Sequence, residues 1–172
     1  REDKKVSHWV DFALASVEPK KRRRSRIPLR KYFEDLASHW EPYLVERKSS
    51  IDLIFNSEDE ILMLAHEIDL DSIFYNLIIN SVEVFTNPNV PWTGERNIYI
   101  EVKGSDEGYV TIDYFDSGPG ISDAYSKPED IFIFGESTKK TEGDESGTGI
   151  GMWILKAIVD DYKGRARLKT LD

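Results

Sequence analysis

The sequence predicts an α/β domain, in which helices and strands share one core. Apolar residues recur at helical spacing in residues 29–48 and 70–85, whereas they alternate at every second position in residues 98–102 and 109–116. The chain has 172 residues, of which 40% are hydrophobic and 12% aromatic, so it is long enough to bury a sizeable core as one domain.

The composition excludes several kinds of site and partner. The chain has no cysteine, so disulfides and thiolate metal sites are ruled out. Its net charge of -9 argues against nucleic acid as the main partner, because a polyanion needs a positive surface. No apolar run approaches the ~18 residues of a membrane span, so we expect no membrane contact by these residues. The first residue is Arg1 and not Met, which we interpret as the start of a fragment.

Residues 1–18 carry an apolar stripe at helical spacing, and Pro19 follows it. This helix could pack on its own domain or continue a longer helix that pairs with another chain, and the sequence leaves both open. Residues 20–26 then hold six cations in seven positions. Such a run can bind nucleic acid or anionic lipid, but in an acidic chain we interpret it as a solvated, extended linker.

The next elements follow from spacing and turn residues. Pro28 and Leu29 open a predicted helix that runs to about Lys48, and residues 51–55 predict a short strand. Residues 61–66 fit either a second strand or a turn of helix. The helix predicted over residues 70–85 has Asp71 or Ser72 as its cap and an apolar row that we expect to be buried, namely Phe74, Ile78, Val82 and Phe85.

A second face of that helix is polar. Asn76, Asn80 and Glu83 recur at spacings of four and three, so they project from the same side. Asparagine gains little from helix propensity, because its side chain competes for backbone hydrogen bonds. The stripe therefore fits either a solvent-facing surface or a ligand site. The neutral amide oxygen of Asn80 would suit Mg²⁺, which keeps waters and takes its remaining ligands from substrate phosphates.

The two alternating segments predict a hairpin. In its second strand, every second residue from Val110 to Asp116 faces the apolar side. A carboxylate on that side requires donors, and the amino group of a purine is one such donor. Gly118 and Gly120 then let the backbone turn sharply and come close to a bulky group. An ordinary acidic turn fits the same residues equally well.

A glycine-rich segment opens the last predicted helix. Residues 147–152 read G-T-G-I-G-M and lead into an apolar helix at residues 153–159. Backbone N–H groups at the positive end of a helix suit phosphate. The spacing matches neither the dinucleotide fingerprint nor an ordinary P-loop. Gly164 ends this helix, and alternation in residues 165–171 predicts a last strand.

Four motifs occur in one order: an asparagine helix, D-x-G-x-G, an aromatic segment and a glycine-led helix. Together they resemble the GHKL ATP-binding superfamily, and within it the catalytic, ATP-binding domain of sensor histidine kinases. The match covers roughly residues 51–171, with the N box at residues 76–81, the G1 box at 116–121, the F box at 131–139 and the G2 box at 147–152. The resemblance implies a two-layer α/β sandwich of the Bergerat type. Three helices would lie on one face of a mixed, mostly antiparallel sheet, and a lid would span residues 122–146.

The resemblance also implies which residues bind ATP and Mg²⁺. Asp116 would bind the adenine amino group, Asn80 would hold Mg²⁺, and Asn76 would assist at the phosphates. The implied catalytic residues are Asn76, Asn80 and Lys139. The F-box residues Phe132 and Phe134 would close the lid, although core packing is nearly as good a role for them. The full set of implied nucleotide contacts is Asn80, Glu83, Asp116, Gly118, Gly120, Ile121, Phe134, Thr138, Lys139, Gly147, Thr148, Gly149, Ile150, Gly151 and Met152.

Three departures from the family pattern matter. Asn76 stands where the hydrolysing branch has a general-base glutamate, which favours phosphoryl transfer to a protein over attack by water. Glu83 stands where many kinases have a cation, so Lys139 or Lys140 must supply that charge, or ATP binding is weakened. The motif of a phospho-acceptor histidine is missing from the place where the family has it, so we expect the acceptor upstream of Arg1.

The implied function is that of a histidine autokinase. The ATP γ-phosphate would pass to a histidine on a neighbouring helical domain, and then to the aspartate of a response-regulator receiver domain. Residues 1–26 would be the end of a dimerisation helix with a basic linker, and residues 27–172 the ATP-binding domain of a cytoplasmic kinase that is a homodimer in its full chain. The alternatives are an ATP-gated conformational ATPase and a non-catalytic nucleotide-binding interaction module.

Overall fold

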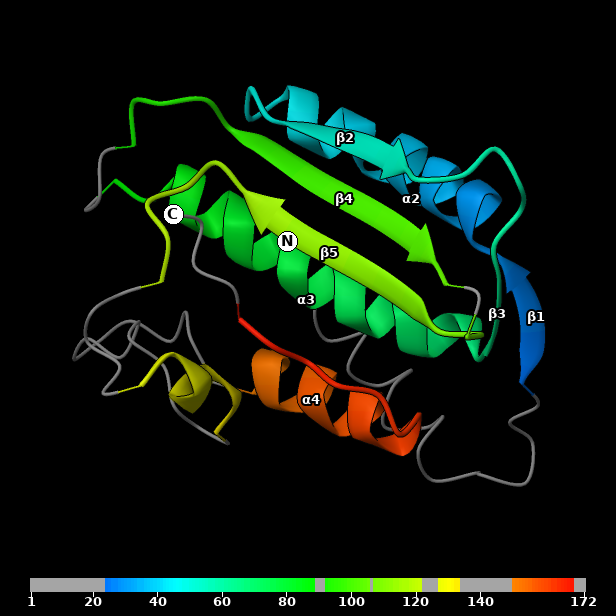
Figure 1. Ribbon diagram of the computed structural model, residues 1–172. Coiled ribbons are helices and arrows are strands. Elements are labelled where there is room, and N and C mark those ends of the chain that lie inside the picture. The colour runs from blue at the N-terminus through cyan, green and yellow to red at the C-terminus, as the bar shows by residue number, and fades with distance from the viewer. Residues whose placement is uncertain (1–23, 89–91, 106, 122–126, 134–149, 169–172) are drawn as a thin grey trace.

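A three-stranded sheet carries the predicted hairpin. The computed structural model describes residues 24–88, 92–105, 107–121, 127–133 and 150–168. Strands β2 (Ser50–Phe55), β4 (Asn97–Gly104) and β5 (Val110–Asp116) lie in the order β2-β4-β5 (Figure 1). The β2 and β4 strands are parallel, and the β4 and β5 strands are antiparallel. A separate antiparallel pair joins β1 (Ser25–Pro28) to β3 (Leu62–Ala65). The predicted mixed pairing is thus confirmed, although the strands form two sheets and the three-stranded one has one parallel and one antiparallel pair.

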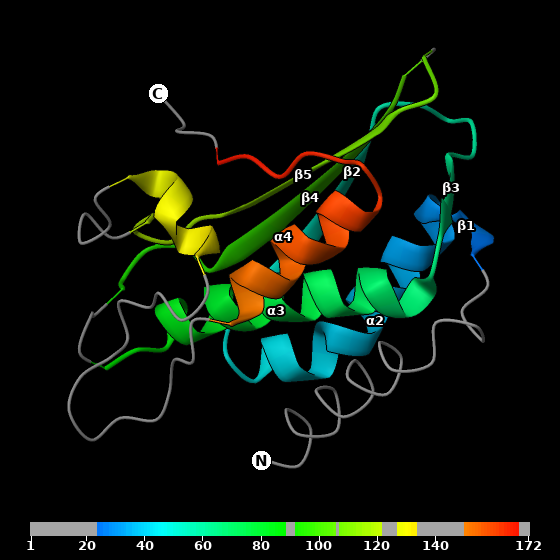
Figure 2. The same ribbon diagram turned by 90° about the horizontal axis from the view of Figure 1, so that it is seen from below.

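The helices form a second layer on one face of this sheet. Helices α2 (Leu29–Val45), α3 (Glu67–Phe85) and α4 (Gly151–Asp161) lie together on the same side, as Figure 2 shows from below. A short 3-10 helix, η2 (Pro128–Phe132), lies near the beginning of α4. The two-layer α/β sandwich expected from the sequence is therefore the fold of the chain.

Alternation along β4 explains which face of the sheet the helices cover. Ile98, Ile100 and Val102 are fully buried, whereas the residues between them are half-buried on the other face. The pairing places Asp116 opposite Ile98 and Tyr114 opposite Ile100. Residues directly opposite each other in a sheet project from the same face. The prediction that Asp116 ends a row on the core side is therefore confirmed.

The core lies between the sheet and the helices α2 and α3. Phe33 of α2 packs edge-on against Phe74 of α3, with ring centroids 4.8 Å apart. The row predicted to be buried on α3, Phe74 to Phe85, is at most 2% exposed. Tyr32 also donates a hydrogen bond of 2.9 Å to Asp71, which fixes α2 against α3. This packing holds α3 as the central helix of the layer.

Several element boundaries differ from those predicted. Helix α3 begins at Glu67, after the extended residue His66, so Asp71 and Ser72 lie inside the helix and do not cap it. The Ser72 hydroxyl instead donates to the Ile68 carbonyl, one turn back along the helix. Helix α2 ends at Val45 and not at about Lys48, which has a φ of 55°. Residues 62–65 form a strand, which answers the question that the sequence left open.

Both ends of the described chain also differ from the prediction. Helix α4 begins at Gly151, and its end is closed by the hydrogen bond from Gly164 N to Val159 O at 2.9 Å. Residues 165–168 form no strand, although their sequence alternates. At the other end, β1 starts at Ser25, inside the run interpreted as a solvated linker. The helix predicted for residues 1–18 lies outside the described residues. Among the described helices, none is long and apolar enough to cross a membrane.

Candidate functional site

The predicted motif residues come together along helix α3. The end of β5 contacts the C-terminal half of α3, through Asp116 and Ser81. The beginning of α4 contacts the same helix one turn earlier, where Gly151 lies against Asn76. Asn80 lies between these two contacts in the sequence of α3. The glycine-led helix and the D-x-G-x-G turn are thus both held against the asparagine helix, as the sequence led us to expect.

The Asp116 carboxylate is held by donors from two elements. Its Oδ2 accepts a hydrogen bond of 2.5 Å from the Ser81 hydroxyl, and its Oδ1 accepts one of 2.9 Å from the Gly118 backbone N–H. Ser81 is only 3% exposed, so this end of the carboxylate lies against the core. A carboxylate in such a place is fixed in direction, which suits recognition of a single donor on a ligand.

Tyr114 completes this network from the neighbouring position on β5. Its hydroxyl lies 2.8 Å from the Ser81 hydroxyl. Because Ser81 gives its one hydrogen to Asp116, Tyr114 must be the donor in this pair. Burial raises the pKa of Tyr114, so the hydroxyl keeps its proton at neutral pH. The sequence analysis missed the roles of Ser81 and of this hydroxyl. A signal was present, because Ser81 is a small polar residue beside Val82 on the side of α3 that faces the core.

The structure explains why two positions of the D-x-G-x-G turn are glycine. A Cβ added at Gly118 would lie 2.8 Å from Asp116 Oδ1 and 3.3 Å from the Phe85 ring. Gly120 has a φ of +82°, which side chains rarely allow. The turn is therefore packed closely on Asp116 and on the end of α3. Ile121, which follows it, is exposed.

The Asn76 amide has a fixed orientation at the start of α4. Its Nδ2 donates a hydrogen bond of 2.8 Å to the Ser72 carbonyl, so its Oδ1 points away from that bond. A Cβ added at Gly151 would lie only 2.6 Å from this oxygen. Helix α4 also has no side-chain cap, and its first intrahelical bond runs from Ile154 N to Ile150 O. The backbone N–H groups of the first turn are thus without intrahelical partners, beside a polar amide.

These residues fit a phosphate-bearing ligand and one divalent cation. The first turn of α4 offers backbone donors at the positive end of a helix, where phosphate binds well. Within the described ranges the Asn80 side chain has no hydrogen-bond partner. There is also no group of three or more acidic or histidine residues that could hold a metal there. The neutral amide oxygen of Asn80 fits a cation that takes most of its ligands from phosphates and water, as Mg²⁺ does.

The remaining predicted contacts are only partly described. Glu83 lies half-buried on α3, and Ile150 and Met152 are half-buried at the start of α4. Six predicted contacts lie outside the described residues, namely Phe134, Thr138, Lys139, Gly147, Thr148 and Gly149. Their roles stay predictions.

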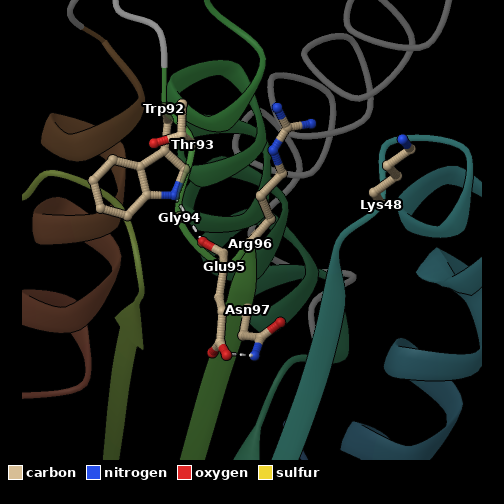
Figure 3. A pocket seen from close by; sticks show the side chains of 7 residues that line it. All are labelled: Lys48, Trp92, Thr93, Gly94, Glu95, Arg96 and Asn97. Carbon is tan, nitrogen blue, oxygen red and sulfur yellow. Dashed lines mark hydrogen bonds between the residues drawn. The ribbon is translucent and has the colours of Figure 1, made fainter.

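One hollow of the described surface lies away from the motif residues. It has a volume of about 480 Å³ and is lined by Lys48 and by residues 92–97 (Figure 3). Figure 3 shows Arg96 and Lys48 among the lining side chains and the Glu95 carboxylate turned toward Asn97. The Arg96 guanidinium donates to the Arg47 carbonyl at 3.0 Å, just beyond the end of α2. Since cations commonly stabilise the carboxyl end of a helix, this charge already has a structural role.

A second hollow, of about 410 Å³, lies near Gly104 and Tyr109 at the opposite end of the β4–β5 hairpin. Neither hollow includes Asp116, Asn80 or Gly151. The candidate site is therefore defined by the contacts of α3 with the D-x-G-x-G turn and with α4.

Comparison with known proteins decides the family. Residues 65–171 match the family described as histidine kinase-, DNA gyrase B-, and HSP90-like ATPase. The chain belongs to this family of ATPases. The matched region contains all four motifs, so the resemblance drawn from the sequence is confirmed. Family membership supports ATP as the nucleotide, whereas Mg²⁺ stays a prediction.

Relatives of this ATPase domain include sensor kinases. A probable C4-dicarboxylate sensor kinase of Halalkalibacterium halodurans is 33% identical over 103 residues, which cover 59% of this chain and 17% of that protein. Histidine kinase P4 of Formosa agariphila is 32% identical over 117 residues, which cover 66% of this chain and 8% of that protein. The chain therefore spans less than a fifth of the length of either relative.

A solved structure has the same fold. The histidine kinase ThkA in complex with the response regulator protein TrrA has a TM-score of 0.60 and 19% sequence identity to this chain. The match covers 94% of this chain and 43% of that one. At this identity the likeness supports the fold of the ATPase domain.

Proposed function

We propose that this chain is the ATP-binding catalytic domain of a sensor histidine kinase. It would transfer the γ-phosphoryl group of ATP to a nitrogen of a histidine outside these residues, with ADP leaving. The observation that carries the proposal is the convergence of Asp116 and Gly151 on one helix, α3, where Asn76 and Asn80 lie. The names of the two relatives, both kinases, support the same assignment.

Each residue of the site would have a separate task. Asp116 would accept a hydrogen bond from the adenine amino group, because its carboxylate is held in one direction by Ser81 and Gly118. The first turn of α4 would hold phosphate oxygens through its backbone N–H groups. Asn80 would coordinate Mg²⁺, which when bound neutralises charge on the phosphates. Lys139 would add positive charge near the γ-phosphate, and Glu83 would lower the affinity for ATP if no cation offsets it.

Asn76 favours transfer to a protein over hydrolysis. Its amide cannot accept the proton of an attacking water as a glutamate would. In the structure its Nδ2 is also committed to the Ser72 carbonyl. The acceptor nucleophile would instead be a histidine of a neighbouring helical domain. A response-regulator receiver domain would then take the phosphoryl group, and the structure of ThkA with TrrA supports such a partner. A cytoplasmic location, where ATP is supplied, and a homodimeric full chain belong to the same proposal.

The proposal is tested with labelled ATP and the full chain. We expect label in the protein that is lost in acid and stable in base, as phosphohistidine is. The variant Asp116→Asn should lose this label, because adenine would no longer meet a carboxylate acceptor. Release of inorganic phosphate at the same rate with no labelled protein would contradict the proposal and favour a conformational ATPase. A failure to bind Mg-ADP at millimolar concentration would leave only a non-catalytic role.

A further inference from the structure

A polar cluster fixes the C-terminal end of α4 to the start of α3. The Tyr162 hydroxyl donates a hydrogen bond of 2.7 Å to Asp69 Oδ2 and accepts one of 2.9 Å from the His66 backbone N–H. Asp69 is only 3% exposed, so this carboxylate depends on protein donors. Burial raises the pKa of Tyr162 to about 12, so its hydroxyl remains a donor at neutral pH. The cluster is a fixed point between the two helices.

Arg24 joins the preceding chain to this fixed point. Its guanidinium carbon lies 4.3 Å from the centroid of the Tyr162 ring, and its Nη2 lies 3.1 Å from Asp161 Oδ2. Arg24 directly precedes β1 and lies within the run of cations at residues 20–26. The Arg24 and Asp161 side chains are 40% and 69% exposed. Ion pairs and cation–π contacts this exposed are weak, so they can open and close.

The other end of α4 is at the candidate site. Helix α4 spans 11 residues, a length of about 16 Å, and begins with Gly151 against Asn76. Along this length Ile154, Leu155 and Ile158 are buried. Figure 1 shows α4 alongside α3, with its last turn on the side of β1. A rigid helix is therefore in contact with Arg24 at one end and with the asparagine stripe at the other.

We propose that Arg24 is a positioning residue that couples the chain before β1 to the nucleotide-binding end of α4. The contact with Tyr162 and Asp161 adds to the polar cluster that holds α4 on α3, and so biases where the first turn of α4 stands relative to Asn76. The inference rests on the proposed function, because its main effect is on phosphoryl transfer. It adds to that function a route by which movement of the preceding segment reaches the site.

The test compares Arg24 variants in the full chain. We expect Arg24→Gln to lower the rate of histidine phosphorylation at saturating ATP by about fivefold, with the Kd for Mg-ADP changed by less than about twofold. Arg24→Lys keeps the charge and should restore most of the rate. The matched control is Arg30→Gln, because Arg30 also stacks on an aromatic ring, that of Phe55, and donates to a backbone carbonyl, that of Ser57. This control should behave as the wild type.

A second readout does not depend on kinase activity. Hydrogen exchange at the Ile154 N–H, which closes the first turn of α4, should become at least about fivefold faster in Arg24→Gln and stay unchanged in Arg30→Gln. Wild-type rates of both transfer and exchange in Arg24→Gln would overturn the inference. Parallel losses of nucleotide affinity and melting temperature would also overturn it, since they indicate a merely structural role. If the wild type forms no phosphohistidine, the proposed function fails, and the exchange result alone decides the coupling.

Discussion

The Ser81 hydroxyl on α3 donates a 2.5 Å hydrogen bond to the Asp116 carboxylate at the end of β5. This bond joins the asparagine helix to the D-x-G-x-G turn, two motifs that are 35 residues apart in the sequence. Tyr114 donates to Ser81 in turn, so the buried Ser81 hydroxyl bonds two residues of β5, Tyr114 and Asp116. The direction of Asp116 is thus set by α3 as well as by its own strand.

The first prediction concerns this bond. Ser81→Ala leaves Tyr114 and Asp116 without a common partner, so we expect the free energy of unfolding to fall by about 1–3 kcal/mol. The affinity for Mg-ADP should fall by about three- to tenfold, because Asp116 loses one of its two orienting donors. Calorimetry and urea unfolding measure the two effects. The control Ser50→Ala removes an exposed hydroxyl that bonds Asn97 and should change neither. Full affinity in Ser81→Ala would show that Asp116 needs no support from α3.

The second prediction concerns Gly151 and Asn76. In Gly151→Ala the new Cβ would lie 2.6 Å from Asn76 Oδ1, so the amide must rotate and lose its bond to Ser72. That loss costs about 1 kcal/mol, and the gain in helix propensity offsets roughly as much. We therefore expect little change in stability but about tenfold weaker binding of Mg-ADP, since the methyl group covers the first turn of α4.

A matched control separates this effect from a general cost of losing glycine. Gly104→Ala meets Ile61 at an ordinary 3.4 Å and should leave nucleotide binding unchanged. The double variant Gly151→Ala with Asn76→Ala should be no less stable than Asn76→Ala alone. If Gly151→Ala binds Mg-ADP as the wild type does, the start of α4 does not approach the phosphates.

The features that could be predicted from the sequence are those in which apolar residues repeat regularly along the chain. The row from Phe74 to Phe85 repeats at helical spacing, and burial of its apolar side chains outweighs any other arrangement. The alternation in β5 fixes its register, because a slip of one residue would turn Asp116 and Tyr114 to the outer face. The faces of α3 and β5, and hence the meeting of Asp116 with α3, could therefore be foreseen.

The missed features depend on contacts between distant segments. Strand β1 has four residues and starts inside a run of cations, so only its pairing with β3 reveals it. Helix α3 starts at Glu67 without a side-chain cap, where Tyr162 instead binds the preceding His66 N–H across the fold. Residues 165–168 alternate but form no strand, because alternation alone supplies no partner. Tertiary contacts decided each of these cases.

The third prediction concerns the metal. Removing Mg²⁺ with EDTA should weaken ADP binding to the wild type by about tenfold, because phosphate charge is then less neutralised. In Asn80→Ala the affinities with and without Mg²⁺ should agree within about twofold. Asn56→Ala is the matched control, since this amide accepts a bond from Gly104 N far from the site. An undiminished effect of Mg²⁺ in Asn80→Ala would place the metal on another group.

The last prediction concerns stability in alkali. Burial raises the pKa of Tyr162 from 10.0 to about 12, so the folded state holds this proton more tightly than the unfolded state does. Its contribution is complete below pH 10 and is lost as the pH rises from 10 to 12. Tyr162→Phe, which leaves Asp69 without this donor, should be less stable than the wild type at neutral pH by about 1–3 kcal/mol. Because Tyr162 is partly exposed, the difference should shrink by roughly 1 kcal/mol across that range. Urea unfolding of both proteins at each pH measures it. A difference that stays constant or grows would mean that the hydroxyl is not held as a neutral donor to Asp69.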